Sequence, residues 1–263
     1  MKFPNIDPIA VELFGISIKW YGIAYVLGLF LGLYYAKFLV RRLNSFNTIN
    51  LDNLLVWIAI GTVLGGRLGY VFFYDFSFYF DNPSLIVLDI RKGGMSFHGG
   101  LLGVTIAIYI YSTLFKLKFL NLVDIVSTCV PIGLFLGRVA NFINSELWGK
   151  PTNLPWGIIF PNGGNIPRHP TQLYEAILEG FFMFIILNII YLKNFNKPGI
   201  TACFFLIIYG LFRFLIELIR EPDYQIGYIY NDFITMGMIL SLPMVFLGFS
   251  LLLLLNVKFR KYN

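Results

Sequence analysis

Long runs of apolar residues recur along the chain, separated by shorter polar segments. A helix needs about 20 apolar residues to cross the hydrocarbon core of a bilayer. Seven runs come close to this length, at residues 20–40, 54–73, 99–115, 122–142, 173–192, 199–218 and 233–255. The alternation of apolar and polar residues that marks the strands of a transmembrane barrel is absent. The pattern therefore predicts an all-α polytopic membrane protein, a bundle of about seven transmembrane helices.

The composition agrees with a surface that faces lipid. Hydrophobic residues make up 57% of the 263 residues, charged residues only 13%, and the mean hydropathy is +0.73. A soluble domain usually carries about a quarter charged residues, so this chain has too few charges to cover a water-exposed surface. The same values exclude a disordered chain and a disulfide-stapled secreted domain. We expect one integral membrane domain over residues 1–263, with loops 74–98 and 143–172 forming a small head at the membrane surface.

Positive charges are concentrated in one set of loops, and this predicts the orientation. Nine Lys and Arg residues occur in the 33 residues of segments 41–53, 116–121, 193–198 and 256–263. Seven occur in the 88 residues of segments 1–19, 74–98, 143–172 and 219–232. Because cytoplasmic loops carry an excess of Lys and Arg, we expect a periplasmic N-terminus and a cytoplasmic C-terminus. The net charge of +6 forms no basic face, so nucleic acid is not an expected partner.

Three arginines fall inside the predicted spans: Arg67, Arg138 and Arg213. An arginine at the centre of a bilayer costs at least ~2.5 kcal/mol on insertion scales. In the predicted topology all three lie in the outer third of outward-running helices, at the depth of an outer-leaflet phosphate. A guanidinium can bind phosphate through paired hydrogen bonds. The arrangement favours a site for an anionic lipid, although snorkelling or a structural ion pair would also accommodate each arginine.

Polar residues accompany two of these arginines. Tyr209, Arg213 and Glu217 are four residues apart and share one helix face. Asn141 and Glu146 follow Arg138 where the chain leaves the membrane. These residues can complete a binding site, or a local Arg213–Glu217 pair can simply offset the insertion penalty.

His98 is the candidate for proton transfer. It lies just before the third predicted helix, between glycines that leave the imidazole uncrowded, and imidazole titrates near neutrality. A structural hydrogen bond is the alternative role for a lone histidine. His169, between Arg168 and Pro170, is expected to be a capping or loop residue.

Several catalytic devices are missing from the sequence. There is no G-x-S-x-G elbow, Walker loop or H-E-x-x-H metal motif. Cys129 and Cys203 lie in apolar runs, where packing is their expected role, and no Cys or His is spaced as a metal ligand.

Several motifs together resemble the prolipoprotein diacylglyceryl transferase family. They are WYG at 20–22, GGRLGY at 65–70, GMSFHGG at 94–100, GRVANFINSELWG at 137–149, RHPTQLYE at 168–175 and YGLFR at 209–213. The resemblance runs from about residue 7 to 245, with the motifs in the family's order. Two departures are Ala140, where the family usually has Gly, and the short stretch between Pro161 and Arg168, where some relatives carry a longer insertion.

The resemblance implies a seven-helix enzyme of the bacterial inner membrane whose active site faces the periplasm. Such enzymes move the diacylglyceryl group of phosphatidylglycerol to the lipobox cysteine of preprolipoproteins, leaving a thioether and releasing glycerol phosphate. The reaction needs membrane lipid and the preprolipoprotein signal peptide as partners, and no metal or organic cofactor.

The resemblance also implies roles for individual residues. The expected catalytic residues are His98, Arg138, Arg213 and Tyr21. The expected substrate-binding residues are Arg138, Asn141, Glu146, Tyr209, Arg213 and Glu217. Arg67 is added to them because of its depth in the predicted span and not because of the resemblance. Two other functions are compatible with outer-leaflet arginines. One is a lipid-binding or lipid-moving protein without covalent chemistry, and the other is a different phospholipid headgroup transferase.

Overall fold

A computed structural model describes residues 1–4, 6–13, 15–43, 50–74, 76–89, 94–222, 227–231 and 233–261. Parts of the loop segments weighed for orientation, including residues 44–49, lie outside these residues. Contacts divide the chain into two compact units: unit 1 is Met1–Ala36 with Asp124–Asn263, and unit 2 is Lys37–Val123.

The prediction of an all-helical membrane protein is confirmed. Within the residues described, seven helices are long and apolar enough to span a membrane. These spans are Trp20–Arg42, Leu51–Phe73, Phe97–Leu114, Phe119–Ile143, Thr171–Asn194, Ile200–Glu217 and Met236–Val257. Each end lies within three residues of the predicted end, because the thickness of the hydrocarbon core sets the length of every run.

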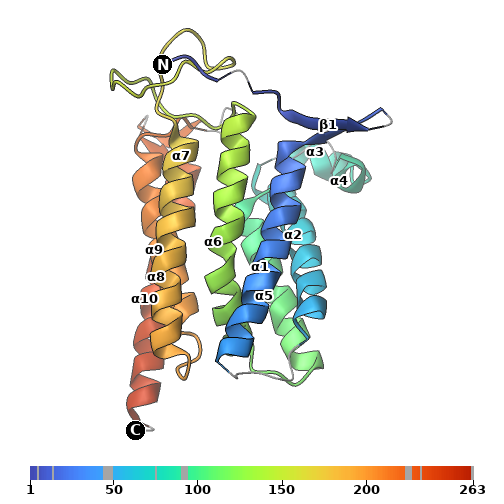
Figure 1. Cartoon of the computed structure of the whole chain (residues 1–263), viewed down its shortest axis with the longest axis vertical. Coiled ribbons are helices and arrows are strands. Elements are labelled where there is room, and N and C mark those ends of the chain that lie inside the picture. The colour runs from blue at the N-terminus through green and yellow to red at the C-terminus, as the bar shows by residue number, and fades with distance from the viewer. Residues whose placement is uncertain are drawn as a thin grey trace. The chain divides into compact units, whose positions relative to one another are not determined.

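Unit 2 is built on helices α2 (Leu51–Tyr74) and α5 (Phe97–Leu114), which lie side by side (Figure 1). Glycines let their backbones touch: a Cβ added at Gly69 would lie 2.5 Å from the Cα of Gly99. Small residues at such crossings are typical of membrane helices, where close packing drives association. Two short helices, α3 (Phe76–Asp81) and α4 (Leu85–Leu88), lie in the connection between α2 and α5.

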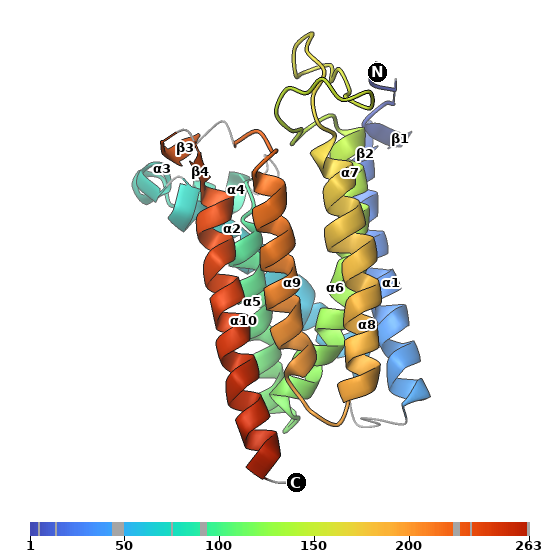
Figure 2. The same cartoon turned by 90° about the vertical axis from the view of Figure 1, so that its left-hand side faces the viewer.

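Unit 1 contains most of α1 (Trp20–Arg42) and of α6 (Phe119–Ile143), together with α9 (Ile200–Glu217) and α10 (Met236–Lys261). Helices α9 and α10 lie side by side (Figure 2). At the N-terminal end of α9, Asp124 accepts hydrogen bonds from Gly199 N at 2.7 Å and Ala202 N at 2.8 Å. The carboxylate of α6 therefore satisfies backbone donors that the first turn of α9 leaves unpaired.

The fifth span is one continuous helix with a change of winding. It begins as α7 (Thr171–Glu175), continues as a π-helical segment, η2 (Ala176–Phe182), and ends as α8 (Met183–Asn194). Gly180 of η2 packs against Phe135 of α6, where an added Cβ would lie 2.6 Å from the Phe135 Cβ. π-Helical turns are rare and are frequent at functional sites.

Two small hairpins and a long loop complete unit 1. Strands β1 (Ile9–Leu13) and β2 (Ile16–Lys19) pair antiparallel before α1, and β3 (Tyr228–Tyr230) pairs with β4 (Ile234–Thr235) before α10. Single bridges organise the loop between α6 and α7, including one between Gly149 and Arg220. In unit 1, this loop and the β1–β2 hairpin lie at the end opposite the last turn of α10 (Figure 1).

Candidate active site

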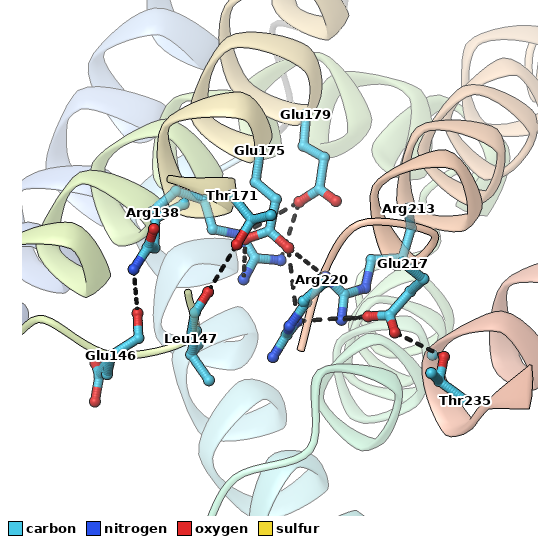
Figure 3. A network of polar contacts seen from close by, with 12 residues as sticks. Arg138, Glu146, Leu147, Thr171, Glu175, Glu179, Arg213, Glu217, Arg220 and Thr235 are labelled. Atoms are coloured by element: carbon cyan, nitrogen blue, oxygen red, sulfur yellow. Dashed lines mark hydrogen bonds and ion pairs between the residues drawn. The ribbon is translucent and has the colours of Figure 1, made fainter. Parts of the chain in front are cut away.

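Three arginines of unit 1 meet at one buried carboxylate, Glu175, at the end of α7 (Figure 3). Its Oε2 lies 3.1 Å from Nη1 of Arg138. Its Oε1 accepts a hydrogen bond from Nη1 of Arg213 and lies 3.6 Å from Nη1 of Arg220. The Glu175 side chain is fully buried. Arg138 and Arg213, both expected in the site, thus contact the same glutamate, which comes from another helix.

Two further glutamates complete the cluster. Glu179, one turn after Glu175, accepts from Nε of Arg138 at 3.3 Å and from Nη2 at 3.0 Å. Glu217 pairs with Nη2 of Arg213, the predicted i,i+4 pair, and lies 3.6 Å from Nη1 of Arg220. We refer to these six residues as the arginine–glutamate cluster. Its formal charges balance, and burial of each charge is tolerated because every arginine has a carboxylate partner.

Glu146 pairs with no arginine in the described contacts. Its carboxylate accepts hydrogen bonds from Nδ2 of Asn141 at 2.9 Å and of Asn144 at 3.1 Å. Its carbonyl accepts from Nε2 of Gln172, at 2.6 Å. The neighbouring Ser145 and Leu147 have positive φ angles of 53° and 61°, a conformation that residues with side chains rarely adopt. The loop is therefore held in a strained form on the first turn of α7.

The two tyrosines predicted for the site also belong to unit 1. Tyr209 is buried one turn before Arg213 on α9, with its ring stacked on Phe205 at 5.9 Å. Tyr21 is the second residue of α1 and remains 37% exposed, with its ring 5.3 Å from that of Tyr25.

His98 and Arg67 belong to unit 2. His98 was expected just before the third helix, but it lies in the first turn of α5, because Ser96 caps that helix and accepts from Gly99 N at 3.2 Å. The His98 ring packs edge-on against Phe97, with 5.5 Å between centroids. Arg67 is buried in α2, where its guanidinium donates to main-chain carbonyls.

Four residues of this region were not assigned to the site from sequence: Glu175, Glu179, Arg220 and Thr235. Thr235 donates to Oε2 of Glu217 at 2.6 Å and accepts from Met238 N at 3.3 Å, which joins the cluster to the start of α10. A signal for two of them was present, because Glu175 and Glu179 are acids four residues apart within an otherwise apolar run.

His169 lies outside the spans and contacts the loop. Its Nδ1 lies 3.4 Å from the Tyr174 hydroxyl, and burial lowers the pKa of its imidazole below the ordinary value. The neighbouring Arg168 pairs with Glu221 at 3.0 Å. These contacts agree with a loop role for both residues.

The donor set of the cluster suits an anion and not a metal ion. Within the described ranges, no three His, Cys, Asp or Glu side chains are grouped so that they could hold a metal. The glutamates of the cluster are instead engaged by guanidinium groups, whose planar N–H donors match carboxylate and phosphate oxygens.

Comparison with known proteins gives one consistent family. A sequence profile of prolipoprotein diacylglyceryl transferase matches residues 8–254. A relative from Rickettsia felis is 48% identical over 261 residues, covering 98% of this chain and 100% of its own length. Relatives from Rickettsia canadensis and Brucella anthropi are 49% and 46% identical, over 96% and 94% of this chain and 98% and 91% of their own lengths. All three are named phosphatidylglycerol–prolipoprotein diacylglyceryl transferase. The chain therefore belongs to the prolipoprotein diacylglyceryl transferase family.

Proposed function

We propose that the protein transfers the diacylglyceryl group of phosphatidylglycerol to the lipobox cysteine thiol of preprolipoproteins. This would be the first step of bacterial lipoprotein maturation. The observation that carries the proposal is the buried convergence of Arg138, Arg213 and Arg220 within a membrane-spanning bundle. Membership in the family supports the reaction assigned to it.

The arginines have the donors that a phosphate requires. Arg138 and Arg213 carry ten N–H groups between them, five on each guanidinium. Their described contacts with Glu175, Glu179 and Glu217 engage five of these N–H groups. A lipid phosphate can therefore bind to the same guanidinium groups while the glutamates keep them in place.

The reaction is a displacement at the glycerol carbon that carries the phosphate. The substrate thiol loses its proton, and its sulfur forms a bond to this carbon. The carbon–oxygen bond breaks, and its electron pair stays on the phosphate oxygen, so that glycerol phosphate leaves with one more negative charge. Arg138 and Arg213 stabilise this growing charge in a poorly hydrated site. The nucleophile belongs to the substrate, so no covalent intermediate with the protein is needed.

His98 is proposed to accept the thiol proton. A free thiol has a pKa of about 8.5, so only a few per cent is ionised near neutrality, and a nearby imidazole can assist. Tyr21, Asn141, Glu146 and Tyr209 are proposed to contact the lipid headgroup or the peptide. The buried Glu217 is proposed to orient Arg213 toward the phosphate.

The proposed location is the bacterial inner membrane, with the cluster toward the periplasm. The distribution of Lys and Arg among the loops supports this orientation. A reporter that is active only in the cytoplasm should be active when fused after Asn263 and inactive when inserted into segment 143–172. The opposite result would reverse the orientation.

The reaction can be tested with purified protein, labelled phosphatidylglycerol and a lipobox peptide. The expected products are a diacylglyceryl thioether peptide and glycerol phosphate in equal amounts, and a peptide with serine in place of the cysteine should remain unmodified. A protein that only binds or moves lipid would retain phosphatidylglycerol without forming either product. A different headgroup transferase would release a different leaving group or modify a different acceptor.

A further inference from the structure

Arg67 of α2 has its guanidinium enclosed by acceptors of its own unit. Its Nε donates to Ile86 O at 2.7 Å, and Nη2 donates to Leu85 O at 3.1 Å and to the Tyr79 hydroxyl at 3.1 Å. Its Nη1 donates to Gly94 O at 3.3 Å. These contacts alone use at least four of the five N–H donors of the group.

The aromatic rings beside the Arg67 guanidinium and its low exposure also argue against contact with a lipid phosphate. The Arg67 guanidinium lies over the ring of Tyr79 at 4.8 Å and that of Tyr70 at 5.8 Å. The residue is only 2% exposed. To bind Arg67, a phosphate would have to displace carbonyl oxygens that already accept its hydrogen bonds. The displaced carbonyls would then lack donors. This differs from Arg138, whose side chain keeps 14% exposure.

The segment that Arg67 binds leads directly to His98. Gly94 has a φ of +81°, and an added Cβ there would lie 2.7 Å from the Tyr70 ring and 3.0 Å from Nη1 of Arg67. Two residues later, Ser96 N donates to Gly66 O at 2.9 Å. The start of α5 is thus fixed to one turn of α2 from Gly94 onward, and His98 follows within four residues.

We propose that Arg67 is a positioning residue that fixes the turn carrying His98 and does not bind the lipid phosphate. The proposal rests on the proposed role of His98 in proton transfer. The depth of Arg67 in its predicted span favoured a substrate-binding role, and the positioning role replaces that expectation. A shift of about 1 Å in a reacting group can lower a rate about 10²-fold, so a residue that acts through His98 should affect turnover strongly.

The test is a double-mutant cycle with Arg67→Lys and His98→Gln, measured with labelled phosphatidylglycerol and lipobox peptide. A lysine ammonium has three N–H donors and cannot donate to the four acceptors that Arg67 contacts. Arg67→Lys should lower kcat by roughly 10- to 100-fold and leave the KM for phosphatidylglycerol within about twofold. In the double variant the loss should equal that of His98→Gln alone, because an effect transmitted through His98 disappears with it.

Two milder variants keep the proposal testable if Arg67→Lys fails to fold. Tyr79→Phe removes one acceptor of Arg67 and should lower kcat by about three- to tenfold at unchanged lipid KM. Tyr109→Phe, which removes the hydroxyl of a tyrosine 58% exposed on α5, is the matched control and should behave as wild type.

The outcomes distinguish the positioning role of Arg67 from the proton-transfer role of His98. A raised lipid KM for Arg67→Lys, with losses that multiply in the double variant, would show that Arg67 contacts the lipid and overturn the positioning role. Wild-type turnover of His98→Gln would instead remove the proposed role of His98, and the positioning proposal with it.

Discussion

Gly237 of α10 faces the carboxylate of Glu217 on α9 so closely that an added Cβ would lie 2.6 Å from its Oε1. Glycine at position 237 therefore lets Glu217 reach Arg213 and Arg220 at the same time. Thr235, the last residue of β4 and the residue just before α10, donates to the other oxygen of Glu217. The first turn of α10 thus sets the position of a charged group on the neighbouring helix.

The first prediction concerns this contact. Gly237→Ala should push the Glu217 carboxylate away, misplace Arg213 and lower turnover by roughly 10- to 100-fold. Gly248→Ala is the control, because its Cβ would meet Ile207 at 2.7 Å and the Cys203 carbonyl at 2.8 Å, within the same helix pair. It should lower the thermal midpoint but leave the turnover of folded protein unchanged. Equal turnover in both variants would remove the special role of Gly237.

The second prediction concerns Glu175, which pairs with three arginines. Glu175→Gln keeps the shape but leaves more buried cations than anions, so unfolding free energy should fall by ~3–5 kcal/mol. Asp52→Asn is the control, because it breaks the exposed Lys37–Asp52 pair, with side chains 35% and 65% exposed. Such surface pairs contribute under about 1 kcal/mol. Similar thermal midpoints for the two variants would contradict a structural role of the cluster.

The third prediction concerns the geometry of the guanidinium groups. Arg138 contacts Glu175 and Glu179 through different nitrogens, and Arg213 does the same with Glu175 and Glu217. A lysine ammonium retains the charge but cannot span two carboxylates and a phosphate. Arg138→Lys and Arg213→Lys should each lose ~2–4 kcal/mol of transition-state stabilisation, or roughly 30- to 1,000-fold in rate. Turnover near the wild-type value in both would show that charge alone suffices.

The fourth prediction concerns pH. If His98 removes the thiol proton, His98→Gln should lose roughly 10²- to 10⁴-fold in rate near neutral pH. Raising the pH toward the thiol pKa of about 8.5 should recover part of this loss, because more thiol ionises without a base. Binding of labelled phosphatidylglycerol should change little. Abolished lipid binding, without recovery at high pH, would make His98 a headgroup-positioning residue.

The spans could be predicted from sequence because hydrocarbon thickness is one constraint that acts on every run independently. The Arg213–Glu217 pair was equally accessible, since i,i+4 neighbours share a helix face by geometry. The partners of Arg138 were not, because Glu175 and Glu179 follow it by 37 and 41 residues and the pairing depends on how α6 packs against the fifth span. No short-range periodicity in the sequence predicts how these two helices pack.

The contacts of Arg67 could not be predicted from sequence either, for a different reason. Its position in an apolar run identified it as unusual, and depth alone suggested a lipid phosphate as its partner. Its actual acceptors are mainly carbonyl oxygens of Leu85, Ile86 and Gly94, which every residue type possesses. A sequence does not show which main-chain carbonyls an arginine contacts. It therefore cannot distinguish an arginine whose donors are already paired from one that can bind a ligand.

The π-helical segment makes the fifth span sensitive to length in a way that substitutions do not reveal. A π-helical turn closes i→i+5 hydrogen bonds and so holds one residue more than an α-helical turn, and deleting one residue within Ala176–Phe182 should let the segment rewind as an α-helix. The buried residues Met183, Leu187, Asn188 and Tyr191 would then keep their face, whereas a deletion within α8 itself would turn the residues after it by about 100° and expose part of that face. The extra residue thus lets Glu175 and Glu179 face the arginines while α8 buries a face with a different register.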